Sequence, residues 1–229
     1  KDVKVKHKDT RGYTPLYLAI WKDTTAPFNE DERRKIIAMI LESEQLDVFA
    51  TNNQQSNYLH IACIQQDSET AMLLLQKEPR LNNAKDNLGR LPLHEAAFKN
   101  NADVIGEMLK KDKDHPVLVA DDERGIIKSP IVNAKDDQGS TALHIACQEQ
   151  HFENVKILLQ FGADAKIKNN VNEFTPFMKA VEKHNLDIIS VILESDANVV
   201  NIPNVQGFTP LHKLADSLPS DEKLKFDIL

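Results

Sequence analysis

Apolar residues recur at helical spacing in several parts of the chain. The clearest example is the stretch HFENVKILLQFGAD, whose apolar face consists of Phe152, Val155, Ile157, Leu158 and Leu159. Gly162 follows the last of these, and glycine often ends a helix because it tolerates a left-handed backbone. Similar patterns occur in ETAMLLLQKE, ADVIGEMLKK and LDIISVILES, which begin at Glu69, Ala102 and Leu186. Each stretch is predicted to be an amphipathic helix.

A second unit recurs ahead of these helices. Its six copies are DTRGYTPLYLAI from Asp9, NNQQSNYLHIA from Asn52, DNLGRLPLHEAA from Asp86, DDQGSTALHIAC from Asp136, NVNEFTPFMKAV from Asn170 and NVQGFTPLHKLA from Asn204. Their TPLH-like tetrads begin at Thr14, Asn57, Leu91, Thr141, Thr175 and Thr209, at separations of 43, 34, 50, 34 and 34 residues. A turn glycine, a capping threonine and a proline at the first helical position are signals of a helix start. Each tetrad is therefore predicted to begin a first helix, with the amphipathic second helix after it.

The tetrad and its spacing resemble the ankyrin repeat, whose signature is T-P-L-H-x-A. The resemblance covers nearly all of residues 1–229 and implies an all-α, ankyrin-repeat solenoid in a single domain. We expect about six helix-turn-helix units with short β-hairpin loops, with repeats that start near residues 9, 52, 86, 136, 170 and 204. One helix pair cannot bury its apolar side alone, so the units are expected to stack into one continuous core.

Two inserts interrupt the repeat period, at about residues 22–32 and 112–132. The first ends in NEDERRKIIAMIL, where Asn29 and Glu32 have the spacing of a capping box for an extended second helix. The second contains DKDHPVLVADDERGIIKSP and is predicted to be a solvent-exposed loop, with a partner-specific contact element as the alternative. Gln55 and Glu173 stand where the turn glycine would be, which costs about 1 kcal/mol each if the backbone there is left-handed.

The pentapeptide LHIAC occurs at Leu59–Cys63 and again at Leu143–Cys147. A histidine and a cysteine three residues apart share a helical face, and this is a common pair of zinc ligands. However, the cysteine slot holds isoleucine, alanine or valine in the other repeats, so a metal site is not expected. In the ankyrin family the histidine of the tetrad is structural, which implies the same role for His60, His94, His144 and His212. Cys63 and Cys147 are then small buried residues.

Composition, charge and the absence of known motifs argue against several classes of function. The net charge of −7 argues against nucleic acid as a partner, and the chain has no apolar run long enough for membrane insertion. Two cysteines in 229 residues fit a reducing cytoplasmic setting. We find no phosphate-binding loop and no hydrolase or zinc-protease motif, and thus expect no catalytic residues, no cofactor and no metal. The chain is expected to be a monomer and a fragment of a longer protein.

The resemblance also implies a binding surface, because ankyrin stacks generally bind partner proteins on a concave side formed by hairpin tips and first helices. On the variable positions of that side lie Arg11, Tyr13, Trp21, Ile64, Leu88, Arg90, Phe98, Phe174 and Phe208. Exposed aromatic residues and arginine are typical of interface hot spots. We therefore expect a non-catalytic protein-protein interaction module. The alternative is the substrate-targeting or regulatory domain of a larger enzyme. The excess of lysine over arginine is typical of AT-rich coding. Degenerate repeats with irregular inserts resemble those of effectors that intracellular bacteria deliver into host cytosol and those of poxvirus or protozoan proteins, with eukaryotic scaffolds as a further alternative.

Overall fold

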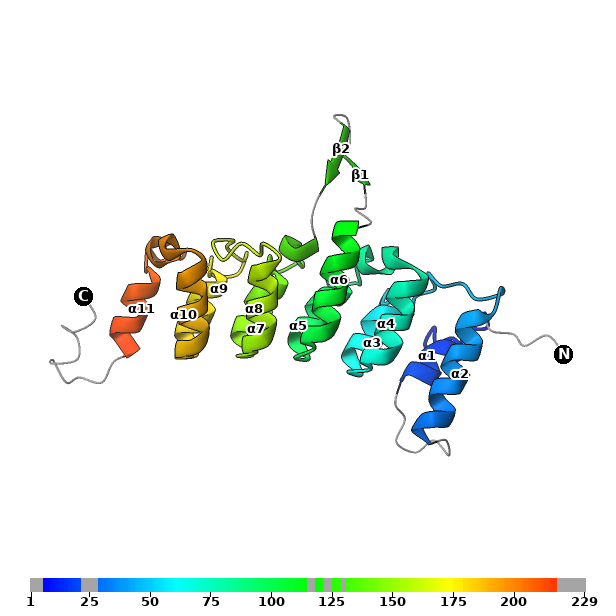
Figure 1. Ribbon diagram of the computed structural model, residues 1–229. Helices are drawn as coiled ribbons and strands as arrows, with labels where there is room; N and C mark the ends of the chain where they lie inside the picture. Colours follow the sequence, from blue (N-terminus) through cyan, green and yellow to red (C-terminus); the bar gives the residue numbers. More distant parts are fainter. Residues whose placement is uncertain (1–5, 22–28, 115–117, 122–124, 129–130, 218–229) are drawn as a thin grey trace.

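The computed structural model describes residues 6–21, 29–114, 118–121, 125–128 and 131–217. These residues form a row of antiparallel helix pairs in which the described ends of the chain lie at opposite ends of the stack (Figure 1). The first, inner helices are α1 (Pro15–Ile20), α3 (Tyr58–Ile64), α5 (Pro92–Phe98), α7 (Ala142–Gln148), α9 (Pro176–Glu182) and α11 (Pro210–Ser217). The second, outer helices are α2 (Glu30–Glu42), α4 (Ser68–Lys77), α6 (Ala102–Asp114), α8 (Phe152–Gln160) and α10 (Leu186–Ser195). Short 3-10 helices follow at η1 (Pro79–Asn83), η2 (Ile131–Asn133) and η3 (Ala197–Asn201).

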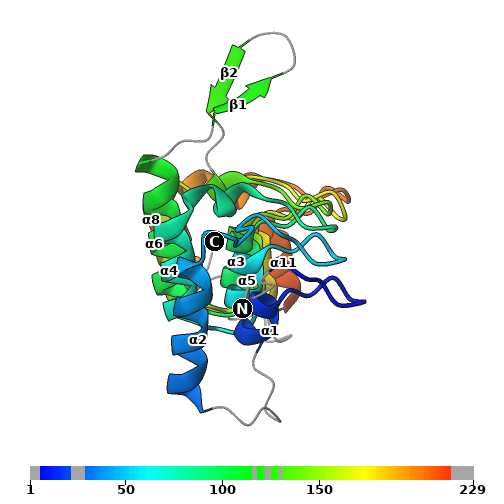
Figure 2. The ribbon, with the colours of Figure 1, turned by 90° about the vertical axis from the view of Figure 1, so that its right-hand side faces the viewer.

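The molecule has two helical layers and a row of turns. Figure 2 shows the outer helices on one side, the inner helices in the middle and the loops that precede the inner helices projecting on the other side. Inner helices pack on inner helices, as in α3 with α5 and α7 with α9, while α4, α6, α8 and α10 form the parallel outer row. The expected all-helical solenoid is therefore confirmed.

The core runs along the whole stack between the two layers. Leu59 and Ala62 of α3, Leu93 and Ala96 of α5, and Leu143 and Ala146 of α7 are all fully buried at equivalent places in successive repeats. Outer helices contribute Leu74, Ile105, Val155, Leu158, Ile188 and Ile192. Because each layer of this core is shared by two repeats, the stability of any repeat depends on its neighbours.

Helix starts follow the signals in the sequence. The side chains of Thr14 and Thr175 accept hydrogen bonds from the backbone N–H groups of Tyr17 and Met178, and Pro follows each threonine at the first helical position. The Asn29 side chain accepts a hydrogen bond from the Glu32 N–H, and the Glu32 carboxylate accepts one from the Asn29 N–H, so the predicted capping box is confirmed. Gln55 and Glu173 have φ of 59° and 54°, which confirms that both adopt the left-handed turn without a glycine.

The structure describes only part of each of the two inserts. Residues 22–28 of the first insert lie outside the described residues, and its last residues begin α2. In the second insert, α6 continues to Asp114, and the strands β1 (Leu118–Asp121) and β2 (Gly125–Lys128) pair as an antiparallel hairpin. The expectation of a loop is therefore wrong for these residues, since their backbones pair with one another. Figure 1 shows this hairpin projecting away from the stack near α6.

Candidate protein-binding surface

The turns that project from the stack are joined by a ladder of backbone hydrogen bonds. The N–H of Asn87 donates to the carbonyl of Gln54 at 2.9 Å, and the same bond recurs from Asn170 to Gln138 at 2.8 Å. Gly139 has φ of 75°, and a Cβ atom at this position would lie 2.7 Å from the backbone nitrogen of Asn170. That distance is shorter than a van der Waals contact, so a side chain at position 139 would require the Asn170 turn to shift. The ladder holds the turns side by side, so their tips form one continuous edge.

The tetrad histidines fasten each inner helix to the next turn. Nδ1 of His60, His94 and His144 accepts the backbone N–H of Asn57, Leu91 and Thr141, respectively. The Nε2 atoms then reach carbonyl oxygens of the following repeat: Arg90 at 3.0 Å, Ala134 and Ser140 at 3.2 Å each, and Phe174 at 3.0 Å. Both ring nitrogens are therefore used within the fold, and the structural role expected for these three histidines is confirmed.

The chemistry of the histidines and cysteines also fits a structural role. Burial lowers the pKa of His60 and His94, and it lowers the pKa of His144 to about 4, so these rings are neutral at physiological pH. Burial raises the pKa of the Cys63 and Cys147 thiols far above their usual range. In the described part of the chain, no three side chains of the metal-ligating types come together. His212 makes the same Nδ1 contact to Thr209, but its ring is exposed because α11 is the last described inner helix.

The first repeat carries a tyrosine in place of the tetrad histidine. The Tyr17 hydroxyl accepts a hydrogen bond from the Asn52 side chain at 2.9 Å, which links the first repeat to the second. The Tyr17 ring lies between those of Tyr13, with centroids 4.0 Å apart, and Trp21, at 6.1 Å. The Arg11 guanidinium lies 4.6 Å from the Tyr13 ring centroid. Sequence reasoning missed that Tyr17 is the central ring of this aromatic stack, although its position in the histidine slot was visible.

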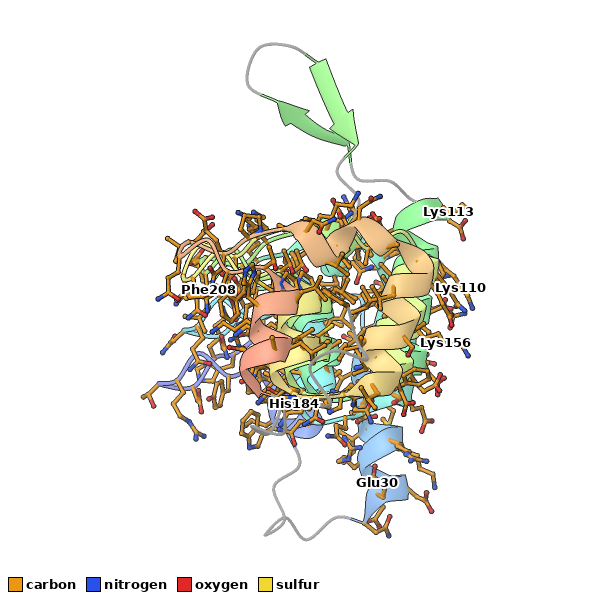
Figure 3. The ribbon with its side chains drawn as sticks, turned by 90° about the vertical axis from the view of Figure 1, so that its left-hand side faces the viewer. Glu30, Lys110, Lys113, Lys156, His184 and Phe208 are labelled. Carbon is orange, nitrogen blue, oxygen red and sulfur yellow. The ribbon has the colours of Figure 1, made fainter. Side chains whose placement is uncertain are left out.

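Exposure agrees with the sequence-based expectation at most of the selected positions. Four apolar residues are well exposed: Trp21 at 40%, Leu88 at 57%, Phe98 at 45% and Phe208 at 40%. Arg11 is also exposed, and Tyr13, Ile64 and Arg90 are partly buried. Figure 3, viewed along the stack, shows Phe208 on the side of the projecting turns, whereas Lys110 and Lys156 lie on the outer helices at the opposite side.

Phe174 is the exception, because only 5% of it is exposed. The expectation that its side chain faces solvent is wrong. The ammonium groups of Lys179 on α9 and Lys213 on α11 lie 5.0 and 5.7 Å from its ring centroid. The neighbouring inner helices thus cover a ring that the repeat pattern alone places on the open side.

A hollow of about 310 Å³ lies between the third and fifth repeats on the same side of the molecule. Its wall includes Arg90, Phe98, Ile145, Gln148, Asn172 and Lys179. Nη1 of Arg90 lies 3.2 Å from Glu95, and its Nε lies 3.9 Å from Asp136. The hollow therefore combines an exposed aromatic ring with polar groups held in place by neighbouring repeats. Ile145 and Lys179 were not among the selected residues, although both occupy the slot directly after the tetrad.

Comparison with known families agrees with this geometry. The model described as ankyrin repeats (3 copies) matches residues 29–119 and 155–222, and the single ankyrin repeat model matches residues 138–170. The chain belongs to the ankyrin repeat family. Ankyrin repeats are protein-protein interaction modules and are generally non-catalytic.

Relatives of this ankyrin chain come from diverse sources. It is 29% identical to the probable 26S proteasome regulatory subunit p28 of Saccharomyces cerevisiae, over 70% of this chain and 80% of that protein. It is 27% identical to the putative ankyrin repeat protein L371 of Acanthamoeba polyphaga mimivirus, over 92% of this chain and 29% of that protein. It is also 23% identical to the NAD-dependent deacetylase sir2B of Dictyostelium discoideum, over 90% of this chain and 27% of that protein. The ankyrin stack thus spans most of the first relative but under a third of the other two.

Within the described residues of the ankyrin chain, no helix has the length and apolar character needed to cross a membrane.

Proposed function

We propose that this chain is a non-catalytic binding module that holds a partner protein on its concave side, along the turn tips and inner helices. The module acts as a monomer in the cytoplasm. All six repeats contribute to one domain, and the partner contacts several of them at once.

One observation carries the proposal: large apolar side chains that do not contribute to packing between repeats lie exposed on the side of the turns and inner helices. Trp21, Phe98 and Phe208 are each at least 40% exposed, and Phe98 borders the hollow that Arg90 and Lys179 also line. A partner that covers such rings gains the free energy of burying aromatic area, and hot spots of this kind cluster around pockets. The ladder of turn bonds also presents these side chains on a rigid frame, which reduces the entropy lost on binding.

The test is photocrosslinking with a benzophenone amino acid at position 98 on α5, compared with position 156 on the outer helix α8. We expect a protein partner to crosslink from position 98 and not from position 156. Binding of the recovered partner is then titrated with Phe98→Ala and Trp21→Ala, each expected to weaken affinity about thirtyfold, a loss of about 2 kcal/mol. Phe152→Ala is a matched control, since Phe152 is a 37% exposed phenylalanine on the outer layer. Crosslinking from position 156 alone, or equal loss in all three variants, would contradict the concave site.

A second candidate function is a substrate-targeting or regulatory domain of a larger enzyme, such as a secreted bacterial effector acting in host cytosol. The observation that favours it is the similarity to a deacetylase of which this chain spans only 27%. Activity assays on the full-length protein with and without the ankyrin stack separate the two candidates. If removal of the stack changes activity toward a protein substrate, the stack is a regulatory or targeting domain of that enzyme.

A further inference from the structure

The concave side changes in character along the stack. The slot seven residues after the start of each tetrad holds Trp21, Ile64 and Phe98 in the first three repeats, and Gln148 and Glu182 in the next two. Leu18 lies one turn before Trp21 on α1 and is 47% exposed, which widens the apolar row at that end. The first three repeats thus form an apolar half of the concave side.

The other half of the concave side carries two lysines beside one buried ring. Lys179 and Lys213 come from adjacent inner helices, and both ammonium groups lie within 6 Å of the single Phe174 ring. Lys213 also lies 5.9 Å from the exposed ring of Phe208. Each ammonium group can attract a carboxylate of a partner. Lys179 has a contact of 3.6 Å with Glu182, whose side chain is 35% exposed, so a partner carboxylate could compete with Glu182 for this ammonium group.

Building on the proposed function, we infer that the partner segment is an amphipathic α-helix that lies along the stack. Its apolar stripe covers Trp21, Ile64 and Phe98, and its acidic end reaches Lys179 and Lys213. The central apolar side chain of the stripe, or the next one along it, enters the hollow beside Phe98.

Spacing supports a helix. Packed inner helices have axes about 8 to 10 Å apart, so equivalent side chains in adjacent repeats recur at about that distance. In a helix, residues about seven apart lie on one face and are separated by about 10.5 Å. In a β-strand, residues on one face are separated by about 6.6 Å or multiples of it, and this does not match the spacing of about 8 to 10 Å between adjacent repeats. A polyproline II segment, with about 9.3 Å for three residues, does match and therefore has to be distinguished in other ways.

Hydrogen bonding favours the α-helix over the polyproline segment. A polyproline II chain leaves its backbone carbonyls open and needs donors from the groove, whereas an α-helix pairs its own backbone groups. In the apolar half two of the three tyrosine hydroxyls are engaged within the fold, Tyr17 with Asn52 at 2.9 Å and Tyr58 with Thr14 at 2.7 Å. His60 is likewise occupied at both ring nitrogens. An α-helix, whose backbone groups are hydrogen-bonded to one another, therefore loses less solvation free energy on this surface than a polyproline II segment does.

The test uses four labelled peptides of roughly 30 residues, because five steps of about 8 to 10 Å separate the first repeat from the sixth and a helix rises about 1.5 Å per residue. Their affinity for the complete chain is measured by fluorescence anisotropy. The first peptide carries leucines at heptad spacing and glutamates in its last turns. The second has the same composition with the leucines at irregular spacing, the third has lysines in place of the glutamates, and the fourth is proline-rich with a leucine at every third position. We expect the first peptide to bind at least about tenfold more tightly than each of the others.

Variants of the chain complete the test. Trp21→Ala and Phe98→Ala should each weaken binding of the first peptide about tenfold or more, with Phe152→Ala unchanged. Lys213→Glu should weaken the first peptide and strengthen the lysine peptide, so that the preference reverses. Tighter binding of the proline-rich peptide, or no difference between the first and second peptides, would overturn the inference. If a partner still crosslinks from position 98 in that case, the helix is wrong and the concave site stands; if neither occurs, both are wrong.

Discussion

Nε2 of His144 lies 3.0 Å from the carbonyl oxygen of Phe174, which belongs to the next repeat, 30 residues further along the chain. The bond joins a buried side chain to the backbone of a turn, so it holds the turn regardless of which side chain the turn carries. His60 makes the corresponding bond to the carbonyl of Arg90. The residues that present the proposed binding surface are thus positioned by histidines buried beneath it.

Replacement of His144 by alanine should lower the free energy of unfolding by about 1 to 3 kcal/mol, because the Thr141 N–H and the Phe174 carbonyl lose a buried partner. Chemical denaturation measures the change. His212→Ala is the matched control, since its ring is exposed, and should cost less than half as much. Equal losses for the two variants would show that inter-repeat bonding is not the cause.

Acid should destabilise the stack through the same histidines. The folded-state pKa of His144 is about 4, below the ordinary value of about 6.5, so the unfolded chain binds the proton more readily. Stability is therefore full above pH about 6.5 and falls as pH decreases toward about 4. The lowered pKa values of His60 and His94 act in the same direction. Urea unfolding at several pH values measures this, and His144→Met should reduce the slope in that window; an unchanged slope would contradict the assignment.

Gln55 has φ of 59° and occupies a turn position that glycine fills in other repeats. Gln55→Gly should raise stability by about 0.5 to 1 kcal/mol, because relief of left-handed strain exceeds the entropy that glycine adds to the unfolded chain. Gly139→Ala is the opposite control. It should lower stability by about 1 kcal/mol or more, since its Cβ would lie 2.7 Å from a backbone nitrogen of the next turn. Thermal melts of the two variants should shift in opposite directions.

Arg33 on α2 ties the first repeat to the second. Its guanidinium donates to the Ala19 carbonyl at 3.2 Å and to Asp67 at 2.8 Å, and its side chain is only 12% exposed. Burial raises the pKa of the Asp67 carboxyl, but hydrogen bonds from Thr70 and Arg33 outweigh it and lower the pKa overall.

Arg33→Ala should therefore cost about 2 kcal/mol or more, since it leaves a buried carboxylate without its cation. Arg34→Ala, at a 48% exposed arginine 3.0 Å from Glu69, should cost less than about 1 kcal/mol. Hydrogen exchange should show that Arg33→Ala increases opening of α1 and α2 in particular. Uniform loss of protection along the whole stack would contradict this local role.

The cysteines should be inert in the folded protein. Cys63 and Cys147 are fully buried, and burial raises the pKa of both thiols, so little thiolate forms. We expect no reaction with Ellman's reagent until the chain is denatured, and no zinc retained after dialysis against a chelator. Stoichiometric zinc, or rapid labelling of native protein, would refute the structural interpretation of the LHIAC pairs.

Much of the local structure could be predicted from the sequence. The capping pair of Asn29 and Glu32, the left-handed turns at Gln55 and Glu173 and the roles of His60 and His144 each depend on residues close in the chain or on a slot repeated every 34 residues or so. Because each structural requirement recurs in several repeats, an ambiguous position in one repeat can be interpreted from the residues at the same position in the others. The departure of Tyr17 from the histidine slot was likewise visible, but its hydrogen bond to the Asn52 side chain was not.

The sequence by itself determined the family, the helix pairs and which side of each inner helix is open, because these follow from periodicity and from local backbone preferences. Only the tertiary structure decided which open positions remain accessible. Phe98 is 45% exposed, whereas Phe174, in another variable slot, is only 5% exposed and lies beside Lys179 and Lys213. The difference arises because exposure depends on the length and charge of side chains in the adjacent repeats, which meet only when the repeats stack. The hollow beside Phe98 has the same origin: its walls come from three repeats, and no single repeat contains it.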